Sequence, residues 1–179
     1  MKLAEKELLK IRNLEASDLD QLWNLVERDL TNVPLSWPKN SKHFEEWLLN
    51  GILDELPTKY IIEYDDKGIT KIAGIISIDI INNENQINYQ MASTGDANVS
   101  YMTFPDFAGL GVATFAVNEI SKILISNKLK PILRIAIWNK ASARVAIKCG
   151  FIKHDSGVII QDYFDEEPTI LDVYRKIII

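Results

Sequence analysis

The residues best suited to bind an anionic ligand lie in a turn that follows a strand expected over Val99 to Phe104. Gly109 and Gly111 precede an apolar helical pattern, and Ala113 and Thr114 fall in the first turn of that helix. The first backbone N–H groups of a helix lack helical partners and carry the positive end of its dipole, so they can bind phosphate without a basic side chain. Glycine lets the backbone approach such a ligand closely. The turn therefore predicts a phosphate or pyrophosphate site, to which the Thr114 hydroxyl could add a contact.

A Gly-x-Gly turn also occurs in strand–helix packing, in P-loops and in dinucleotide sites. A Gly-x-Gly turn often serves only close packing between a strand and a helix. A P-loop requires Lys and Ser or Thr after its last glycine, whereas Val112 and Ala113 follow Gly111. A dinucleotide site requires an acidic residue at the end of the next strand, and the strand expected over Ile132 to Trp138 contains none. The sequence thus disfavours both nucleotide patterns and leaves the packing role open.

A second segment with chemical potential begins at Asn139, directly after an expected buried strand. Ser142 lies one helical turn later, and Gly150 with Phe151 ends the helix and starts another strand. Asn and Ser are also good helix caps, and Gly is a common helix stop. A structural role is therefore the alternative to a chemical one for these four residues.

The two segments together resemble the GNAT acyl-CoA N-acetyltransferase superfamily. The phosphate motif of that family, Gln/Arg-x-x-Gly-x-Gly/Ala, matches the stretch Ala108 to Ala113, with Ala108 at the first position. Its downstream motif is Asn-x-x-Ser/Ala followed by Gly-Phe, which Asn139, Ser142 and Gly150-Phe151 match in register. The expected order of strands and helices is also similar to that of the family over nearly the whole chain.

The resemblance implies an acetyl-CoA-dependent N-acetyltransferase in which a primary amine attacks acetyl-CoA directly in a ternary complex. The Asn-x-x-Ser form, with Tyr101 on the strand before the turn, is most similar to the branch of ribosomal-protein N-terminal acetyltransferases. Asn139 would bond the pantetheine arm and Ser142 would face the sulfur, and both are the implied catalytic residues. Backbone groups of Met102 and Phe104 would pair with the pantetheine. The implied coenzyme A contacts are Met102, Phe104, Gly109, Leu110, Gly111, Val112, Ala113, Thr114, Asn139 and Ser142.

Two positions depart from the family pattern. Ala108 replaces the usual Gln or Arg beside the phosphates, and Ala146 stands where many members carry a Tyr that protonates the leaving thiolate. Ser142 is then the nearest candidate proton donor. Asp79 and Glu84 are candidate general bases by position only. These departures also permit an alternative function, a non-catalytic acyl-CoA-binding regulatory module on the same fold, and a nucleotide-binding protein unrelated to coenzyme A is a third.

The chemistry of the amine favours some acceptors over others. A lysine amine with a pKa of about 10.4 requires about 4 kcal/mol for deprotonation near pH 7.5, whereas an α-amine with a pKa of about 8 requires less than about 1 kcal/mol. No carboxylate lies in a motif that would fix it as a base. We therefore expect an N-terminal α-amine of a protein, or a small-molecule amine, as the acceptor.

Hydrophobic periodicity predicts a single domain over residues 1–179 with the order β-α-α-β-β-β-α-β-α-β-β. We expect a mixed α/β sheet, mostly antiparallel, with a central parallel pair of strands that splay apart in the GNAT-like fold, and helices on its faces. Ser17 and Ser41 are the expected caps of the first two helices. The expected strands are 8–12, 59–64, 69–81, 99–104, 132–138, 151–160 and 169–178, and the expected helices are 19–30, 41–52, 113–127 and 141–149.

Composition limits which partners, metals and compartments are expected for this chain. The net charge of −5 and the lack of a dense basic cluster argue against a nucleic-acid footprint, and no apolar run is long enough to span a membrane. The single cysteine, Cys149, fits a reducing cytoplasm and a small buried thiol. His43 and His154 have no partners at ligand spacing, so no metal is expected. Trp37 is the aromatic residue expected to shape the acceptor pocket, and the chain is expected to be a monomer or a homodimer.

Overall fold

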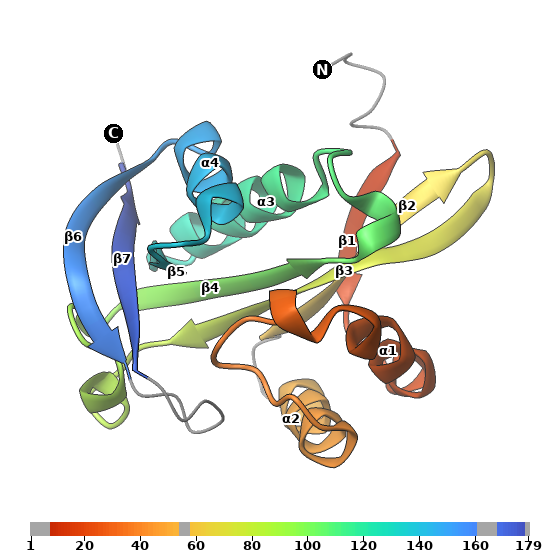
Figure 1. Cartoon of the computed structure of the whole chain (residues 1–179), viewed down its shortest axis with the longest axis horizontal. Coiled ribbons are helices and arrows are strands. Elements are labelled where there is room, and N and C mark those ends of the chain that lie inside the picture. Colours follow the sequence, from red (N-terminus) through yellow and green to blue (C-terminus); the bar gives the residue numbers. More distant parts are fainter. Residues whose placement is uncertain (1–7, 54–57, 161–167, 178–179) are drawn as a thin grey trace. The chain divides into compact units, whose positions relative to one another are not determined.

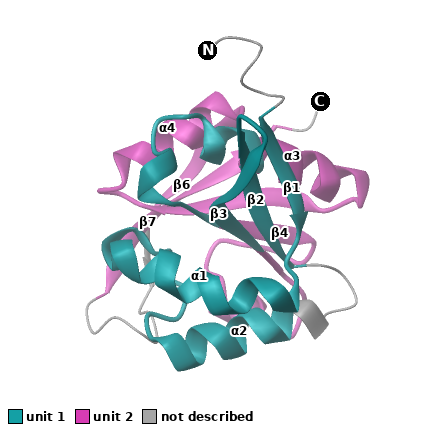
Figure 2. Ribbon diagram, turned by 90° about the vertical axis from the view of Figure 1, so that its right-hand side faces the viewer, with its two compact units in different colours: residues 1–77, 101–116 teal, residues 78–100, 117–179 magenta. Residues whose placement is uncertain are grey.

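A computed structural model describes residues 8–53, 58–160 and 168–177 of the chain. The chain divides into two compact units, which Figure 2 distinguishes by colour. Unit 1 contains Met1–Ser77 and Tyr101–Ala116, and unit 2 contains Ile78–Ser100 and Val117–Ile179. Each unit is described by itself below. No helix among the described residues is long and apolar enough to cross a membrane.

Unit 1 contains an antiparallel arrangement of strands and two helices (Figure 1). Strand β1 (Leu9–Asn13) pairs with β2 (Lys59–Asp66), and β2 pairs with β3 (Ile69–Ile80). The β2–β3 turn has positive φ at both Lys67 (56°) and Gly68 (86°), which matches the twist of a two-residue hairpin. This turn closes a β-hairpin between the antiparallel strands β2 and β3. Helix α1 (Leu19–Val26) packs against α2 (Ser41–Leu53).

The caps of these helices differ from the sequence prediction. Ser17 does not cap the first helix, because Glu15 and Asp18 form a capping box one turn earlier. The N–H of His43 donates to Oδ1 of Asn40 at 3.0 Å, so Asn40, and not Ser41, caps α2. Helix α1 ends at Val26, and a 3-10 segment, Glu27–Asn32, continues the chain where a single helix was expected.

Trp37 lies in the core of unit 1, and the expectation that it shapes an acceptor pocket is wrong. Its side chain is 1% exposed, and Nε1 donates to Oγ of Ser77 at 2.9 Å. The ring packs on Trp47 with centroids 4.8 Å apart. Phe44 is buried beside Trp47. A buried indole N–H needs a hydrogen-bond acceptor, and Ser77 supplies it.

The remaining strands complete a seven-stranded sheet with the order β1-β2-β3-β4-β5-β7-β6. Strands β4 (Asp96–Thr103) and β5 (Lys130–Ala136) are parallel and connected through α3 (Val112–Ser126). Strand β7 (Thr169–Lys176) is antiparallel to both β5 and β6 (Phe151–Ile160), and α4 (Lys140–Lys148) connects β5 to β6. The sequence prediction of a mixed sheet with one parallel pair is confirmed.

The parallel ladder between β4 and β5 is short. It comprises three residue pairs, from Asp96–Lys130 to Asn98–Ile132, although β5 continues to Ala136. The expected strand end at Trp138 is wrong, because the N–H of Asn139 donates to the carbonyl of Ala136 at 2.8 Å and turns the chain. Trp138 is 59% exposed beyond that turn. The acidic segment 165–167 lies outside the described residues.

Candidate functional site

The glycine-containing turn is built in unit 1 by a reversal of the chain between β4 and α3. A single 3-10 turn, Pro105–Phe107, follows β4, and both Gly109 (φ 78°) and Gly111 (φ 82°) then adopt the left-handed conformation. Side chains strongly disfavour this conformation, which explains glycine at both positions. The first helical hydrogen bond of α3 runs from the N–H of Phe115 to the carbonyl of Gly111 at 2.9 Å.

Several backbone donors of this turn have no backbone acceptor. Within the described residues, the N–H groups of Gly109, Gly111, Val112 and Ala113 form no backbone hydrogen bond. A Cβ atom built on Gly109 would meet open space, and Ala108 is exposed. The turn therefore presents amide donors and the helix N-terminus to open space, which is the arrangement that binds a phosphate.

At Met102 and Phe104, the two residues that the family resemblance assigned to pantetheine, the backbone of β4 faces β3. The N–H of Phe104 donates to the carbonyl of Ala73 at 2.9 Å, and the carbonyl of Phe104 accepts from Phe107. The carbonyl of Met102 lies against Gly74. Because backbone groups alternate in direction along a strand, those of Thr103 face the opposite edge of β4.

Asn139 and Ser142 come together in unit 2 at the start of α4. Oδ1 of Asn139 accepts a hydrogen bond from the N–H of Ser142 at 3.0 Å, so Asn139 is the helix cap. Its Nδ2 and the hydroxyl of Ser142 form no hydrogen bond with any of the described residues. The Nδ2 group of Asn139 and the hydroxyl of Ser142 are therefore available to a ligand, while Oδ1 of Asn139 caps α4.

The candidate proton-transfer residues have different environments. Ala146 is fully buried, so the position where the family often has Tyr is part of the core of unit 2. Glu84 is exposed in the loop between β3 and β4. Asp79 is partly buried at the end of β3 and accepts a hydrogen bond from Nδ2 of Asn98 at 3.2 Å. Burial raises the pKa of the Cys149 thiol to about 11, so this residue is no nucleophile at neutral pH.

Arg134 is a residue that the sequence reasoning missed. It lies on β5, and its Cζ is 5.1 Å from the centroid of the Tyr89 ring. Burial lowers the pKa of Arg134, and the nearby Tyr89 and Asp79 oppose that effect. The available signal was a single charged residue in the otherwise apolar stretch Pro131 to Trp138.

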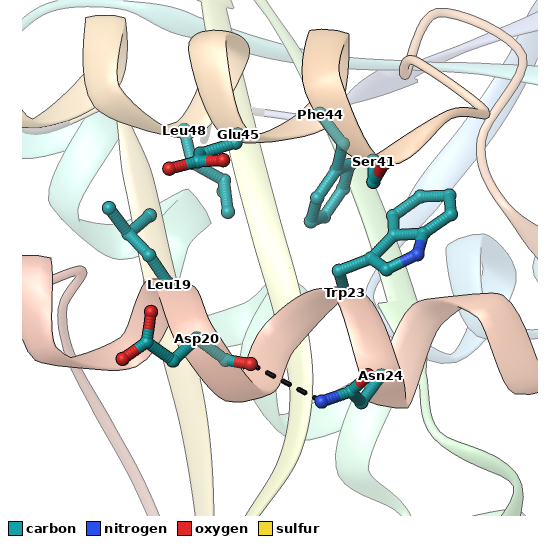
Figure 3. Close-up of a pocket in the computed structure, with 8 residues that line it drawn as sticks. All are labelled: Leu19, Asp20, Trp23, Asn24, Ser41, Phe44, Glu45 and Leu48. Atoms are coloured by element: carbon teal, nitrogen blue, oxygen red, sulfur yellow. Dashed lines mark hydrogen bonds between the residues drawn. The ribbon is translucent and has the colours of Figure 1, made fainter.

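A small pocket of about 160 Å³ lies between α1 and α2 in unit 1 (Figure 3). The rings of Trp23 and Phe44 approach each other on one side, with centroids 5.6 Å apart. Trp37, which the sequence analysis expected to shape the acceptor pocket, does not line this pocket. Its lining comprises Leu19, Asp20, Trp23, Asn24, Ser41, Phe44, Glu45 and Leu48.

No metal centre is evident among the residues that the structure covers. They include no group of three or more His, Cys, Asp or Glu side chains that could hold an ion. The phosphate-binding turn in unit 1 and the Asn139–Ser142 pair in unit 2 are thus two separate groups of candidate ligands, and both consist of uncharged donors.

The comparisons with known proteins agree with this arrangement. The model of the acetyltransferase (GNAT) domain family matches residues 9–152, which is most of the chain and includes both groups of candidate ligands. The chain matches no curated protein sequence at a significant level. Solved structures resemble it over nearly its whole length at low sequence identity, so they show a shared fold.

Three of these structures illustrate the range. The microcin C7 self-immunity acetyltransferase MccE, in complex with acetyl-CoA and AMP, has a TM-score of 0.74 at 19% identity, covering 96% of this chain and 93% of that one. The ribosomal L7/L12 α-N-protein acetyltransferase RimL, in complex with coenzyme A, has a TM-score of 0.75 at 18% identity, with coverage of 96% and 94%. The spermidine N-acetyltransferase of Vibrio cholerae, with CoA and spermine, has a TM-score of 0.69 at 21% identity, with coverage of 94% for both chains.

Proposed function

Since this chain belongs to the GNAT acetyltransferase family, we propose that it transfers the acetyl group of acetyl-CoA to a primary amine. The observation that carries the proposal is the turn at Gly109 to Ala113, where both glycines are left-handed and four amide donors have no backbone acceptor among the described residues. These donors fit a pyrophosphate, and they need no help from the side chain of Ala108. The cofactor of the family supplies a pyrophosphate and an activated acetyl thioester.

The pantetheine arm would be held as an added strand along β4. Met102 and Phe104 direct their backbone groups toward β3, so we assign this contact to the opposite edge of β4, at Thr103. The Nδ2 group of Asn139 is the further donor toward the arm, because its Oδ1 is engaged in capping α4. This assignment revises the sequence expectation for Met102 and Phe104 and retains that for Asn139.

In the reaction, the neutral amine forms a C–N bond with the acetyl carbon, and the carbon–sulfur bond breaks. The nitrogen loses a proton as it becomes an amide, and the departing sulfur gains one. The hydroxyl of Ser142 is the candidate donor to the sulfur, since Ala146 cannot supply a proton. The proton that the nitrogen loses, passed through water, restores that hydroxyl. The protein mainly positions the two reactants. An α-amine on a protein N-terminus or a small molecule suits this site better than an unassisted lysine. The Asn-x-x-Ser form supports placement near the ribosomal-protein N-terminal acetyltransferases, and the single cysteine supports a cytoplasmic location.

A second function, a non-catalytic acyl-CoA-binding module, is favoured by one observation. Position 146 is filled by a buried Ala in the core, so the thiolate-protonating side chain common in the family is lacking there. Binding and transfer therefore have to be measured separately.

The binding experiment is isothermal titration calorimetry with acetyl-CoA, with NAD and ATP as comparison ligands. We expect binding of acetyl-CoA alone, and we expect Gly111→Asp to abolish it through steric and charge repulsion. Gly68→Asp is the matched control, because Gly68 is also left-handed (φ 86°) but lies in the β2–β3 hairpin. Both variants should lose similar stability. If both lose acetyl-CoA binding equally, or if neither loses it, the turn at Gly109 to Ala113 is not the phosphate-binding site.

The transfer experiment follows the release of free CoA thiol with a panel of amines and N-terminal peptides. Release that depends on the amine supports the acetyltransferase. Tight acetyl-CoA binding without release for any acceptor would support the binding module in its place.

A further inference from the structure

Arg134, a half-buried charged residue of unit 2, has two buried nitrogen atoms without a hydrogen-bond partner among the described residues. Arg134 lies between the buried residues Leu133 and Ile135 of β5. Its Nε and Nη2 atoms are buried, and neither forms a hydrogen bond within the part of the chain that the structure describes. Burying a charged donor without an acceptor is costly, so each such group in a native protein calls for an explanation, and a functional role is one.

The surroundings fix the plane of this guanidinium. The ring of Tyr89 covers the guanidinium at 5.1 Å from Cζ, which is the geometry of a cation–π contact. Asp79 lies close enough to favour the charged form of Arg134, and its carboxylate is held by Nδ2 of Asn98 at 3.2 Å. Tyr89 stays a neutral phenol, because burial, and then the charge of Asp79, raise its pKa.

The two unpaired atoms are the pair that recognises oxyanions. In arginine, the Nε–H and one Nη–H group point in the same direction from one edge of the planar guanidinium, and they bind both oxygens of a carboxylate or phosphate side by side. The Tyr89 ring covers a face of the Arg134 guanidinium and not this edge. The Nε–H and Nη2–H groups therefore remain aligned for two oxygens of a ligand.

Arg134 and the phosphate-binding turn at Gly109 to Ala113 lie on different segments of the chain. The β4–β5 ladder ends at Asn98–Ile132, and Arg134 follows two residues later on β5, which leads directly to the Asn139 turn. The proposed function already assigns the phosphates of the cofactor to the turn at Gly109 to Ala113. An oxyanion at Arg134 is therefore assigned to the acceptor and not to the cofactor.

We propose that Arg134 binds an oxyanion carried by the acceptor, so that the substrate is a small amine that also bears a carboxylate or a phosphate. Asp79, beside Arg134, provides the opposite charge that the ammonium group of such a zwitterion requires. This inference rests on the proposed acetyltransferase function. It favours an amino acid or an aminophosphate over a protein N-terminus, whose α-amine has no neighbouring free carboxylate.

The first test compares matched acceptors in the transfer assay. The pairs are phenylalanine with phenylalaninamide and phosphoethanolamine with ethanolamine, and the quantity is the ratio of kcat/KM within each pair. We expect Arg134→Gln to lower the ratio at least tenfold for the pair that the enzyme uses, and Arg134→Lys to restore part of it by charge alone. Comparing the same ratio in wild type and variant cancels differences in amine reactivity. The exposed Arg144→Gln on α4 is the control and should leave the ratio unchanged.

The two acceptor pairs distinguish a carboxylate from a phosphate as the source of the oxyanion. If transfer occurs and the ratio in Arg134→Gln equals that of wild type, this inference is wrong while the proposed function stands. If no amine releases CoA, the proposed function fails, and a binding measurement decides the inference independently.

That measurement is NMR on protein labelled with ¹⁵N-arginine, with the Nε–H signal of Arg134 assigned by its loss in Arg134→Gln. We expect the signal to shift on titration with N-acetylglycine or inorganic phosphate and to stay in place with N-acetylglycinamide. An equal response to the neutral amide, or no response to any of the three probes, would overturn the proposal.

Discussion

The carbonyl oxygen of Met102 on β4 lies so close to Gly74 on β3 that no side chain fits at position 74. The neighbouring N–H of Phe104 donates to the carbonyl of Ala73 at 2.9 Å. The two contacts hold the end of β4 against β3 and thereby direct the backbone of Thr103 to the other edge. The edge of β4 that we assign to pantetheine is thus determined by a glycine on the preceding strand.

Gly74→Ala tests this relationship. The added methyl group must displace the Met102 carbonyl, and we expect the free energy of unfolding to fall by about 1–3 kcal/mol, as for other overpacked cores. The affinity for acetyl-CoA should fall as well, because the end of β4 moves. Urea denaturation and calorimetric titration measure the two effects, with the exposed Thr70→Ala on β3 as the control. Wild-type stability and affinity in Gly74→Ala would show that this contact does not position β4.

Asn139 allows its structural and ligand-binding roles to be separated. Asn139→Ala removes the acceptor for the N–H of Ser142 and should cost about 1 kcal/mol of stability through loss of the helix cap. Asn139→Asp keeps that acceptor but lacks the Nδ2 donor, so it should retain stability. We expect both variants to bind acetyl-CoA more weakly. Wild-type affinity in Asn139→Asp would show that Asn139 only caps α4.

The local sequence pattern predicted several elements close to their observed bounds. The strand Phe151–Ile160 has the predicted bounds, and helix α3 (Val112–Ser126) lies within one residue of the predicted 113–127. In these cases, the residues that specify the element are all local. The glycine motif of the phosphate-binding turn is local too, and Gly109 and Gly111 are both left-handed.

The features that the sequence did not predict depend on distant partners. Asp18, and not Ser17, takes part in capping, and its carboxylate is held by two hydrogen bonds from Arg12 on β1. The direction of the Met102 carbonyl depends on the register of β4 against β3, which no motif encodes. The cation–π contact of Arg134 depends on Tyr89, which belongs to a loop far away in the sequence.

The buried carboxylate of Asp18 predicts an acid-sensitive contribution to stability. Burial would raise the pKa of Asp18, but hydrogen bonds from Arg12 and from the N–H of Glu15 outweigh it, and the pKa lies below its ordinary value of 3.8. A lowered folded pKa gives stability that is present above 3.8 and is lost as the pH falls through the folded value. Asp18→Asn should therefore cost about 2 kcal/mol at pH 7 and less at pH 3.

Urea denaturation at both pH values measures this difference. The exposed Asp20→Asn, at the start of α1, is the control and should change stability little at either pH. A cost for Asp18→Asn that is the same at pH 3 as at pH 7 would contradict the prediction, because it would place the effect outside the ionised carboxylate.

Cys149 should be inert in the folded protein at neutral pH. Burial raises the pKa of its thiol to about 11, with Lys176 opposing the effect, and only the thiolate reacts with iodoacetamide. At pH 8 we expect carbamidomethylation at least about a hundredfold slower than in urea-unfolded chain, with a rate that rises about tenfold per pH unit toward pH 11. The raised pKa also implies stability that is complete below the unfolded value near 9 and is lost as the pH rises toward 11. Mass spectrometry over pH 7–10 checks the rate, and equal labelling of folded and unfolded protein would contradict the burial of this thiol.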